Sequence, residues 1–379
     1  MNNLILLATV FTGYNYGSSL QAFAGKMFIE QLGYDCKIVA KRSLLKGYNI
    51  QVAKLFIMLY RTISLRGKNK SFSTFKKQYT KKLIGLSTGL FDKFIEEHLC
   101  PCYLSWTDLK KIARQCTACL AGSDQIWNST TLYIDPLYYL RFAPEYKRIA
   151  FAPSFGRDFI PDYNEKKLAH WVASFSCLSA REDMGVKLIK RATGRDSIQL
   201  IDPTLMLDRE EWTKHLDLKI REDEYLLAYF LDEPSPKAKK IIWQLAKTMG
   251  CKVMAIPYKF SNMDYCNEMV EAGPKEFLEI IGGAKFVCTD SFHGMAFSIN
   301  FHTPFYVFER NYGSAQKQSS RILSLLTQMC MLHRYEVSEL NDDQIDFSYS
   351  DAVLAKEREK ARQYVLTSIS HCMKKDHSA

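Results

Sequence analysis

The sequence predicts an α/β protein of two Rossmann-like domains that face a cleft, followed by a C-terminal helix. Three observations predict this fold class. The chain has 379 residues, of which 47% are hydrophobic and 24% charged, so it is long enough for two globular domains. Short apolar runs, suited to buried parallel strands, alternate with helical patterns along the chain. The first of these runs leads through a glycine turn into a helix, as in a doubly wound fold.

The first half of the chain carries this alternation. Leu4–Phe11 is a continuous apolar run, Ser18–Gln31 places Leu20 and Phe23 on one helix face, and Gly33 follows its end as a helix terminator. Further strands are expected at Asp35–Ala40, Ala118–Gly122, Ile149–Ser154, Cys177–Ala180 and Ser197–Leu200. Further helices are expected at Val52–Leu65, Leu104–Arg114 and Asn164–Phe175.

The second half repeats the pattern. Strands are expected at Tyr225–Phe230, Lys252–Ile256, Lys285–Thr289 and Phe305–Phe308. Helices are expected at Ser235–Met249, Pro274–Ile281, Gly294–Asn300 and Ser320–Gln328, with a charged amphipathic helix at Ser350–Lys374. We therefore predict an N-terminal domain at 1–205 with a basic helical insert at about 41–90, a C-terminal domain at 206–349 and a helix at 350–379. Two open sheets about a cleft describe the GT-B arrangement.

The net charge of +10 is unevenly distributed. No acidic residue occurs from Cys36 to Phe91, whereas this stretch contains thirteen lysines and arginines. Such a block attracts an anionic membrane face, a lipid diphosphate or nucleic acid. No nucleic-acid-binding motif accompanies it, so we expect no nucleic-acid partner. A solvated helix whose apolar side packs in its own domain is the competing interpretation of Val52–Arg66.

The eleven cysteines are scattered, which favours a reducing compartment over a disulfide framework. Cys100, Cys102, Cys116 and Cys119 invite a zinc interpretation, but their spacing is unusual and the second pair lies in an expected strand. We therefore expect no metal. The apolar N-terminus lacks a basic region before it, and no run of about 18 apolar residues exists. We expect a cytoplasmic protein, peripheral at the inner face of the membrane.

Polar segments follow four expected strands, where ligands bind in open α/β sheets. They are the loop NYGSSLQ at Asn15–Gln21, GSDQIWN at Gly122–Asn128, SARED at Ser179–Asp183 and TDSFHG at Thr289–Gly294. The first suits an anion at a helix start, or it only caps the helix. Trp127 offers a face for a sugar, or it packs in the core. Arg181 matches a carboxylate or phosphate, or it pairs with Glu182 or Asp183. His293 suits proton transfer, or it is structural.

Together with APSFG at Ala152–Gly156 and DPT at Asp202–Thr204, these segments resemble the polysaccharide pyruvyl transferase family, in order and with similar spacing from Met1 to about Leu326. The resemblance implies a GT-B-like fold and the transfer of a pyruvyl group from phosphoenolpyruvate to a glycan, forming a ketal. It also implies that His293 is the essential histidine and Arg181 the anion-binding arginine. Other branches have an arginine where this chain has Ser291, so Arg310, Lys317 or Arg321 would supply that charge here.

The resemblance and the residues together define the expected site. The predicted catalytic residues are His293, Asp290 and Asp124. The predicted donor-binding residues are Arg181, Ser291, Arg321, Lys317 and Arg310. The predicted acceptor-binding residues are Asn15, Tyr16, Gly17, Ser18, Gln21, Gln125 and Trp127. The N-terminal domain is therefore the expected acceptor side, and the C-terminal domain carries the expected catalytic histidine.

Phosphoenolpyruvate is expected as co-substrate, with no other cofactor. The expected acceptor is a galactose-type sugar on a diphosphate lipid carrier, with an anionic membrane surface as a further partner. The alternatives are a GT-B glycosyltransferase that uses a nucleotide sugar, and a non-catalytic component of a glycan assembly complex.

Overall fold

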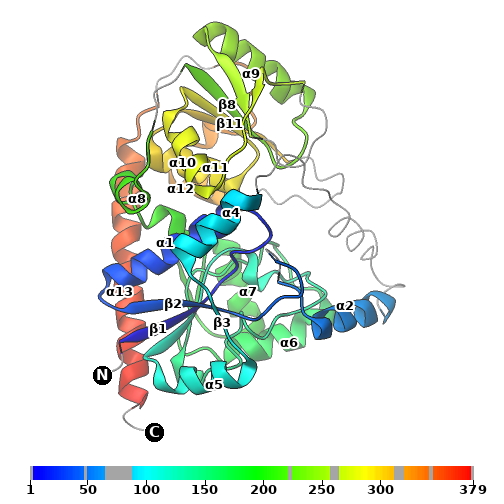
Figure 1. Cartoon of the computed structure of the whole chain (residues 1–379), viewed down its shortest axis with the longest axis vertical. Helices are drawn as coiled ribbons and strands as arrows, with labels where there is room; N and C mark the ends of the chain where they lie inside the picture. Colours follow the sequence, from blue (N-terminus) through cyan, green and yellow to red (C-terminus); the bar gives the residue numbers. More distant parts are fainter. Residues whose placement is uncertain are drawn as a thin grey trace. The chain divides into compact units, whose positions relative to one another are not determined.

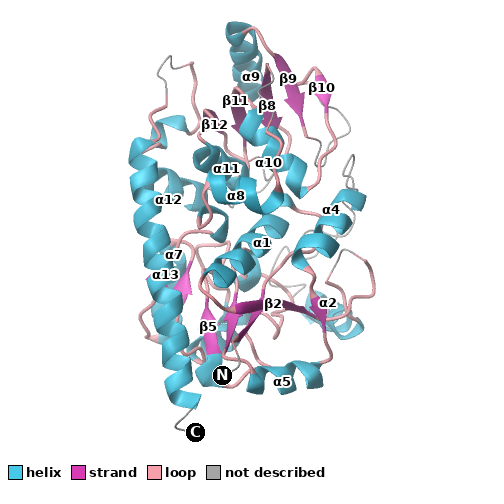
Figure 2. Ribbon diagram, turned by 60° about the vertical axis from the view of Figure 1, so that its left-hand side comes forward, coloured by secondary structure: helices cyan, strands magenta, loops and turns pink. Residues whose placement is uncertain are grey.

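The structure, a computed structural model, describes residues 3–46, 49–64, 88–220, 224–256, 264–310, 320–340 and 345–376. The chain divides into two compact units. The first comprises the described residues of Met1–Lys82, Ile95–Pro203 and Lys360–Ala379, and the second those of Leu83–Phe94 and Thr204–Glu359. Each unit contains a five-stranded sheet, drawn in Figures 1 and 2.

The sheet of the first unit is parallel throughout, in the order β3-β2-β1-β4-β5. Its strands are β1 (Leu4–Ala8), β2 (Asp35–Ala40), β3 (Cys102–Tyr103), β4 (Ala118–Ala121) and β5 (Arg148–Ala150). The short strands β6 (Ser179–Ala180) and β7 (Ile198–Gln199) pair with each other. This order reverses between β1 and β4, and that switch point is where doubly wound sheets bind ligands.

The helices of this unit are α1 (Tyr16–Gln31), α2 (Val52–Ser64), α5 (Trp106–Gln115), α6 (Asp162–Ala173) and α7 (Asp183–Thr193). Helix α1 begins where the Asn15 side chain accepts a hydrogen bond from the Ser18 backbone N–H. It ends just before Gly33, whose φ of 87° lies in the left-handed region that favours glycine. The buried strand β1, the capped helix and the glycine stop follow directly from the local sequence.

The second unit repeats the same order of strands, β10-β9-β8-β11-β12, again parallel. Its strands are β8 (Tyr225–Tyr229), β9 (Lys252–Ala255), β10 (Glu268–Met269), β11 (Phe286–Thr289) and β12 (Phe305–Val307), and Figure 2 shows them side by side. Its helices are α4 (Thr88–Phe94), α8 (Arg209–Leu216), α9 (Pro236–Met249), α10 (Pro274–Gly283), α11 (Phe292–Phe301) and α12 (Ser320–Gln328). The switch point here lies between β8 and β11.

The predicted α/β class, with two Rossmann-like sheets and a C-terminal helix, is confirmed. Helix α13 (Ser348–Asp376) is that C-terminal helix, and its residues from Lys360 onward belong to the first unit. The cleft between the domains stays a prediction. The sequence patterns missed α4 and the two-residue edge strands β3 and β10, because such short elements carry little periodicity. They also missed α7, whose start was interpreted as a binding loop. Much of the predicted basic insert at 41–90 lies outside the described residues.

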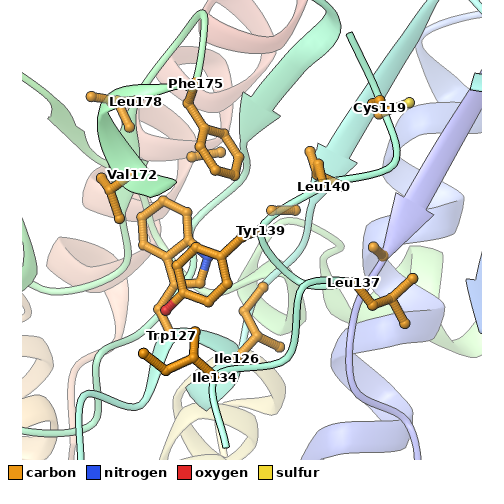
Figure 3. Close-up of a cluster of buried hydrophobic side chains, with 14 of the residues drawn as sticks. Cys119, Ile126, Trp127, Ile134, Leu137, Tyr139, Leu140, Val172, Phe175 and Leu178 are labelled. Carbon is orange, nitrogen blue, oxygen red and sulfur yellow. The ribbon is translucent and has the colours of Figure 1, made fainter. Parts of the chain in front are cut away.

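A cluster of aromatic side chains fills the core of the first unit beside β4 (Figure 3). Trp127 is fully buried and stacks on Tyr139, with their ring centroids 5.5 Å apart. Phe155 and Phe175 meet the same indole edge to face, at 5.6 and 5.1 Å. Such pairs add to the free energy that burial of the rings contributes.

In the described part of the chain, no helix is long and apolar enough to cross a membrane.

Candidate functional site

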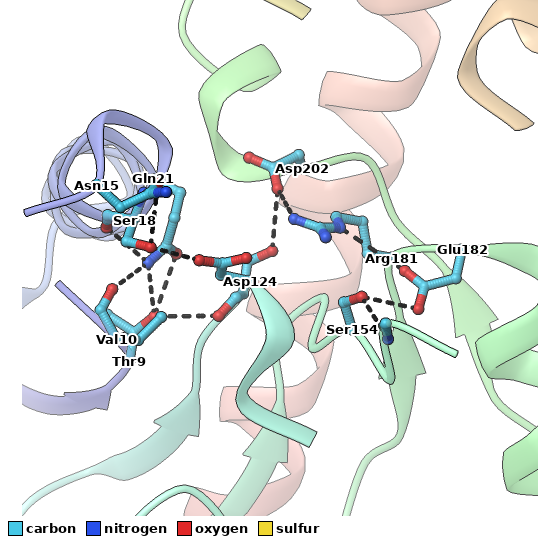
Figure 4. Close-up of polar contacts among 12 residues, drawn as sticks. Thr9, Val10, Asn15, Ser18, Gln21, Asp124, Ser154, Arg181, Glu182 and Asp202 are labelled. Atoms are coloured by element: carbon cyan, nitrogen blue, oxygen red, sulfur yellow. Dashed lines mark hydrogen bonds and ion pairs between the residues drawn. The ribbon is translucent and has the colours of Figure 1, made fainter. Parts of the chain in front are cut away.

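The parallel sheet of the first unit brings the ends of β1, β4 and β5 to one edge, where polar side chains form a network (Figure 4). Thr9 follows β1, and its hydroxyl accepts a hydrogen bond from Gln21 Nε2 at 2.9 Å and lies 3.2 Å from the Ser123 carbonyl oxygen. Ser18 Oγ donates to Asp124 Oδ2 at 2.6 Å. Residues more than a hundred positions apart thus meet at the switch point between β1 and β4.

Asp124 has a left-handed backbone conformation, with a φ of 63° that non-glycine residues rarely adopt. Strain of this kind persists where the surrounding structure holds it, and it is concentrated at functional sites. The carboxylate is half-buried and fixed by Ser18 at the start of α1. The structure therefore brings together Asn15, Ser18 and Asp124 among the predicted residues, and a fixed carboxylate of this kind can orient a hydroxyl group.

Four predicted acceptor contacts are wrong. Trp127 is fully buried and its Nε1–H donates to the Tyr138 carbonyl at 3.1 Å, so the core alternative holds and no face remains for a sugar. Tyr16 and Gly17 are buried inside α1. Gln21 is also buried, and its amide donates to Val10 O, Ser18 O and Thr9 Oγ1. Gln21 thus ties α1 to Thr9 and Val10, which follow β1, and supports the site without lining it.

Gln125 is half-buried in the turn after β4. Its Oε1 accepts a hydrogen bond from Asn128 Nδ2 at 2.9 Å, and the same side chain lies close against Gly156. This position at the strand-end edge leaves its predicted contact with the acceptor a prediction.

Arg181 follows β6 and is paired with two carboxylates. Its Nη1 lies 2.5 Å from Asp202 Oδ2, and its Nε lies 3.7 Å from Glu182 Oε2. All three side chains are buried, with side-chain exposures of 3%, 0% and 6% respectively. Asp202 and Glu182 compensate its charge within the protein, which fits the alternative that Arg181 pairs with a neighbouring carboxylate, and its contact with the anionic donor stays a prediction. Burial tends to lower its pKa, but the carboxylates outweigh burial and raise it.

Glu182 continues this network toward β5. Its Oε1 accepts hydrogen bonds from Ser154 Oγ at 2.9 Å and from the Phe155 backbone N–H at 3.0 Å. Ser123 Oγ donates to Asp202 Oδ2 at 3.3 Å. Thr9, Ser154 and Asp202 had no predicted role, and Glu182 was expected only as an alternative partner of Arg181. Their signal was position, since each lies near the end of an expected strand or just after it, but only the tertiary structure pairs them.

In the second unit, α11 begins at the switch point between β8 and β11. Ser291 is the N-cap, and its Oγ accepts a hydrogen bond from the Gly294 backbone N–H at 3.3 Å. It is 2% exposed, so the structure assigns Ser291 a capping role in place of the predicted donor contact. His293 lies in the first turn of the helix and is 9% exposed. The helix start carries partial positive charge, which suits an anionic ligand beside His293.

Gly294 makes this approach of α11 to β11 possible. A Cβ atom at Gly294 would lie 2.6 Å from Thr289 Oγ1 and 3.2 Å from the Tyr229 ring. Thr289 cannot easily move, because its hydroxyl donates to the Tyr229 carbonyl at 2.6 Å and accepts from the Ser291 N–H at 3.0 Å. Side chains larger than hydrogen at this position therefore push the helix start, and His293 with it, away from the strand.

We expect opposite effects from alanine at two helical glycines of this unit. Gly294→Ala is expected to lower the free energy of unfolding by about 1–3 kcal/mol, through the collision with Thr289. Gly89→Ala, in α4, meets open space and is expected to raise it by up to about 1 kcal/mol, since alanine is the better helix former. Urea unfolding of both variants measures the difference. Equal effects of the two substitutions would contradict the steric role of Gly294.

Asp290 is buried beneath this helix start and ties β11 to the loop after β8. Its Oδ1 accepts a hydrogen bond from the Leu231 N–H at 2.6 Å, and its Oδ2 accepts one from the Asp232 N–H at 3.0 Å. Arg310 Nε lies 2.6 Å from Asp232 Oδ2 and 4.0 Å from Asp290 Oδ2. Burial raises the pKa of Asp290 to about 6, against the opposing effects of Arg310 and the two N–H groups. These contacts hold Asp290 in place beneath the helix start, and its catalytic role stays a prediction.

The raised pKa of Asp290 makes stability depend on pH in a defined direction. The folded state binds this proton more tightly than the unfolded state, whose aspartate pKa is about 3.9. Its contribution is therefore present below about pH 4 and is lost as the pH rises through about 6. Relative to wild type, Asp290→Asn is expected to gain up to about 3 kcal/mol of unfolding free energy between those limits.

Urea unfolding of both proteins at several pH values tests this, with Asp196→Asn, at a 92% exposed carboxylate, as the control. A difference between wild type and Asp290→Asn that does not change with pH would contradict the raised pKa.

Three of the predicted donor-binding residues are cations of the second unit. Arg310 is paired with Asp232, as described above. The Arg321 guanidinium lies over the ring of Phe292, 5.9 Å from its centroid, which places a cation beside the first residue of α11. Lys317 lies outside the described residues. Arg321 is therefore the described cation best placed to meet an anion at this helix start.

The described residues contain no group of three or more histidine, cysteine or acidic side chains placed to hold a metal ion. Cys116 and Cys119 lie with their sulfur atoms 3.5 Å apart in the core. Burial raises the pKa of the Cys119 thiol well above its ordinary value, which disfavours the thiolate that a metal needs.

Two parallel sheets with the same strand order, each with polar side chains at its switch point, define a GT-B-like protein of two Rossmann-like units. The model of the polysaccharide pyruvyl transferase family matches residues 15–312, and the chain belongs to this family. It is accordingly a transferase of polysaccharide biosynthesis. The comparison with curated proteins finds no match.

Solved structures similar to this chain include the UDP-GlcNAc 2-epimerase from Methanocaldococcus jannaschii, at 13% identity and a TM-score of 0.44, covering 94% of this chain and 91% of that one. The glycosyltransferase SnogD from Streptomyces nogalater has 11% identity and a TM-score of 0.40, covering 95% of this chain and 94% of that one. The S. aureus MnaA–UDP structure has 10% identity and a TM-score of 0.45, covering 98% of this chain and 91% of that one.

Proposed function

We propose that this chain transfers the pyruvyl group of phosphoenolpyruvate to two hydroxyl groups of a sugar, forming a pyruvate ketal and releasing phosphate. The observation that carries the proposal is membership of the family over residues 15–312, a span that includes both strand-end sites and His293. The donor sets the main chemical requirement of the site. Phosphoenolpyruvate carries a carboxylate and a phosphate, so its site needs cations and backbone N–H donors.

The start of α11 supports binding of this donor. The helix dipole and the nearby Arg321 favour an anion there, and His293 lies in the same turn. Arg310 adds a second cation to this region, although Asp232 and Asp290 compensate much of its charge. Arg181, in the first unit, is the further predicted donor-binding cation, and Asp202 and Glu182 compensate much of its charge.

The reaction requires two proton movements and one leaving group. Protonation of the methylene carbon makes C2 of the donor electrophilic, and a first sugar hydroxyl adds to C2. The bond from C2 to the phosphate oxygen then breaks, and a neighbouring hydroxyl closes the ketal. Of the two hydroxyl protons released, one balances the proton gained by the methyl carbon and the other leaves with phosphate. His293 is the proposed general acid or base. In the first unit, Asp124 is proposed to orient or deprotonate an acceptor hydroxyl.

The proposed acceptor is a galactose-type sugar of a polysaccharide repeat unit, carried on a diphosphate lipid at the cytoplasmic face of the membrane. The basic sequence from Cys36 to Phe91 supports an anionic carrier, because thirteen cations occur there without an acid. Asn15, Ser18 and Gln125, at the switch point of the first unit, are the remaining candidates for contact with the sugar.

The test is to incubate the purified chain with phosphoenolpyruvate and a panel of lipid-linked and synthetic galactosides. Phosphate release and the mass of the product are followed together. A product heavier by one pyruvyl group, formed with stoichiometric phosphate, supports the proposal. Release of a nucleotide from a nucleotide sugar with the same acceptors, without reaction of phosphoenolpyruvate, would replace it with a glycosyltransferase function.

A further inference from the structure

Helix α2 has an apolar face, and that face is exposed. Phe56, Tyr60 and Ile63 are 68%, 72% and 65% exposed. Val52, Leu55 and Leu59 share that face, at 53%, 38% and 53%. At 100° per residue these six positions form one continuous stripe along the helix. Leu44 and Leu45, just before the helix in sequence, are 57% and 56% exposed as well.

The opposite face of α2 packs against its own unit and carries the charges. Lys54 Nζ donates to the Asn49 carbonyl at 2.8 Å, and Arg61 Nη1 donates to Asn164 Oδ1 at 2.7 Å. Met58 and Thr62 are buried beside them, each at 6% exposure. The helix is thus inverted with respect to an ordinary surface helix, which buries its apolar stripe and exposes its charges. The competing interpretation, in which the apolar side packs in its own domain, is wrong for the described residues.

A contiguous apolar surface of this kind marks a site of interaction with another molecule or with a membrane. The charge of the surrounding sequence decides between these two kinds of partner. Seven basic residues and no acidic one follow α2 in residues 65–87, namely Arg66, Lys68, Lys70, Lys76, Lys77, Lys81 and Lys82. An exposed apolar stripe next to a polybasic sequence provides the two signals that stable attachment to an anionic lipid surface requires.

We propose that α2 is an interfacial helix that docks the protein on an anionic bilayer, with its stripe of Val52, Leu55, Phe56, Leu59, Tyr60 and Ile63 inserted among the acyl chains. The helix has 13 residues, whereas a membrane-spanning helix needs about 20, so it lies in the plane of the interface. The helix lies at the edge of the first unit (Figure 1), and the six side chains of the stripe are between 38% and 72% exposed. This inference goes beyond the proposed reaction, and lipid binding is measured without donor or sugar.

The test is flotation of the full chain with vesicles of phosphatidylcholine alone and of phosphatidylcholine with phosphatidylglycerol. Wild type is expected to bind the anionic vesicles, and salt is expected to weaken the binding. The double variant Phe56→Ser/Ile63→Ser is expected to bind about 100-fold more weakly, the change that corresponds to roughly 3 kcal/mol of lost apolar transfer. The matched control, Trp243→Ser/Met269→Ser, replaces residues 39% and 63% exposed in the second unit and is expected to bind as wild type does.

A second variant tests directly whether α2 inserts into the bilayer. Tyr60→Trp is expected to add fluorescence that shifts to shorter wavelength when anionic vesicles are added, because the indole leaves water. Failure of wild type to bind anionic vesicles, or equal loss in both double variants, overturns the proposal. Light scattering supplies a further outcome that overturns it. If wild type is a dimer that binds no vesicles, and Phe56→Ser/Ile63→Ser converts it to a monomer, the stripe is an interface between two copies.

Discussion

Replacement of His293 by alanine is expected to lower the rate of pyruvyl transfer by about 10²–10⁴-fold, the range for loss of a general acid or base. The side chain belongs to the first turn of α11, after the last residue of β11, and is 9% exposed. The fold should therefore persist, with an unchanged unfolding transition. Because the donor is held mainly by the helix start and Arg321 in this account, the effect is expected in kcat more than in KM.

The control is His215→Ala, at an exposed histidine of α8 in the same unit, which is expected to keep full activity. Initial rates of phosphate release at varied donor concentration separate kcat from KM. If the His293→Ala variant kept the wild-type kcat, His293 would take no part in the chemical step. A selective rise in KM would instead make it a donor-binding residue.

Replacement of Arg181 by methionine is expected to destabilise the protein by about 3–5 kcal/mol, the usual consequence of removing one partner of a buried ion pair. Asp202 and Glu182 would then be buried without the cation that lies 2.5 and 3.7 Å from them. The deficit should shrink as the pH falls, because a carboxylate left in a buried site without its cation is protonated more readily. Activity should fall with stability, since Glu182 and Asp202 hold the loops after β5 and β4.

Urea unfolding at pH 7 and pH 5 measures both effects. Arg191→Met is the matched control, because Arg191 is an exposed arginine on α7 and its loss should change stability by less than about 0.5 kcal/mol. The double variant Arg181→Met/Asp202→Asn is expected to be less destabilised than the sum of its parts, since the two residues interact directly. Strict additivity would contradict the ion pair as the source of the effect.

Local sequence signals predicted most of the secondary structure. The apolar run at the start of the chain became β1 (Leu4–Ala8), and the predicted bounds of β2 (Asp35–Ala40) and α12 (Ser320–Gln328) match the structure. These elements could be predicted because burial of one face imposes a period on the residues of a single segment. Helix α7 was missed, since its start was interpreted as a binding loop around Arg181.

The site was predicted in its positions more than in its contacts. His293, Asp290, Asp124 and Ser18 could be located, because polar residues after buried strands meet at the carboxyl edge of a parallel sheet. The roles of Trp127, Gln21 and Arg181 could not, because each depends on a partner far along the chain. Arg181 and Asp202 are separated by 21 residues, and nothing in either local segment shows that one neutralises the other.

By itself the sequence determined the α/β class, the order of the strands and helices, the family and the basic stretch without acids, since all of these are properties of composition and of short-range pattern. Only the tertiary structure decided which charges are compensated and which apolar side chains are covered. It buried Arg181 between two carboxylates, and it turned the apolar stripe of α2 outward and its lysine and arginine inward. The physical reason is that compensation and burial depend on neighbours that long-range packing supplies, and periodicity within one segment does not specify them.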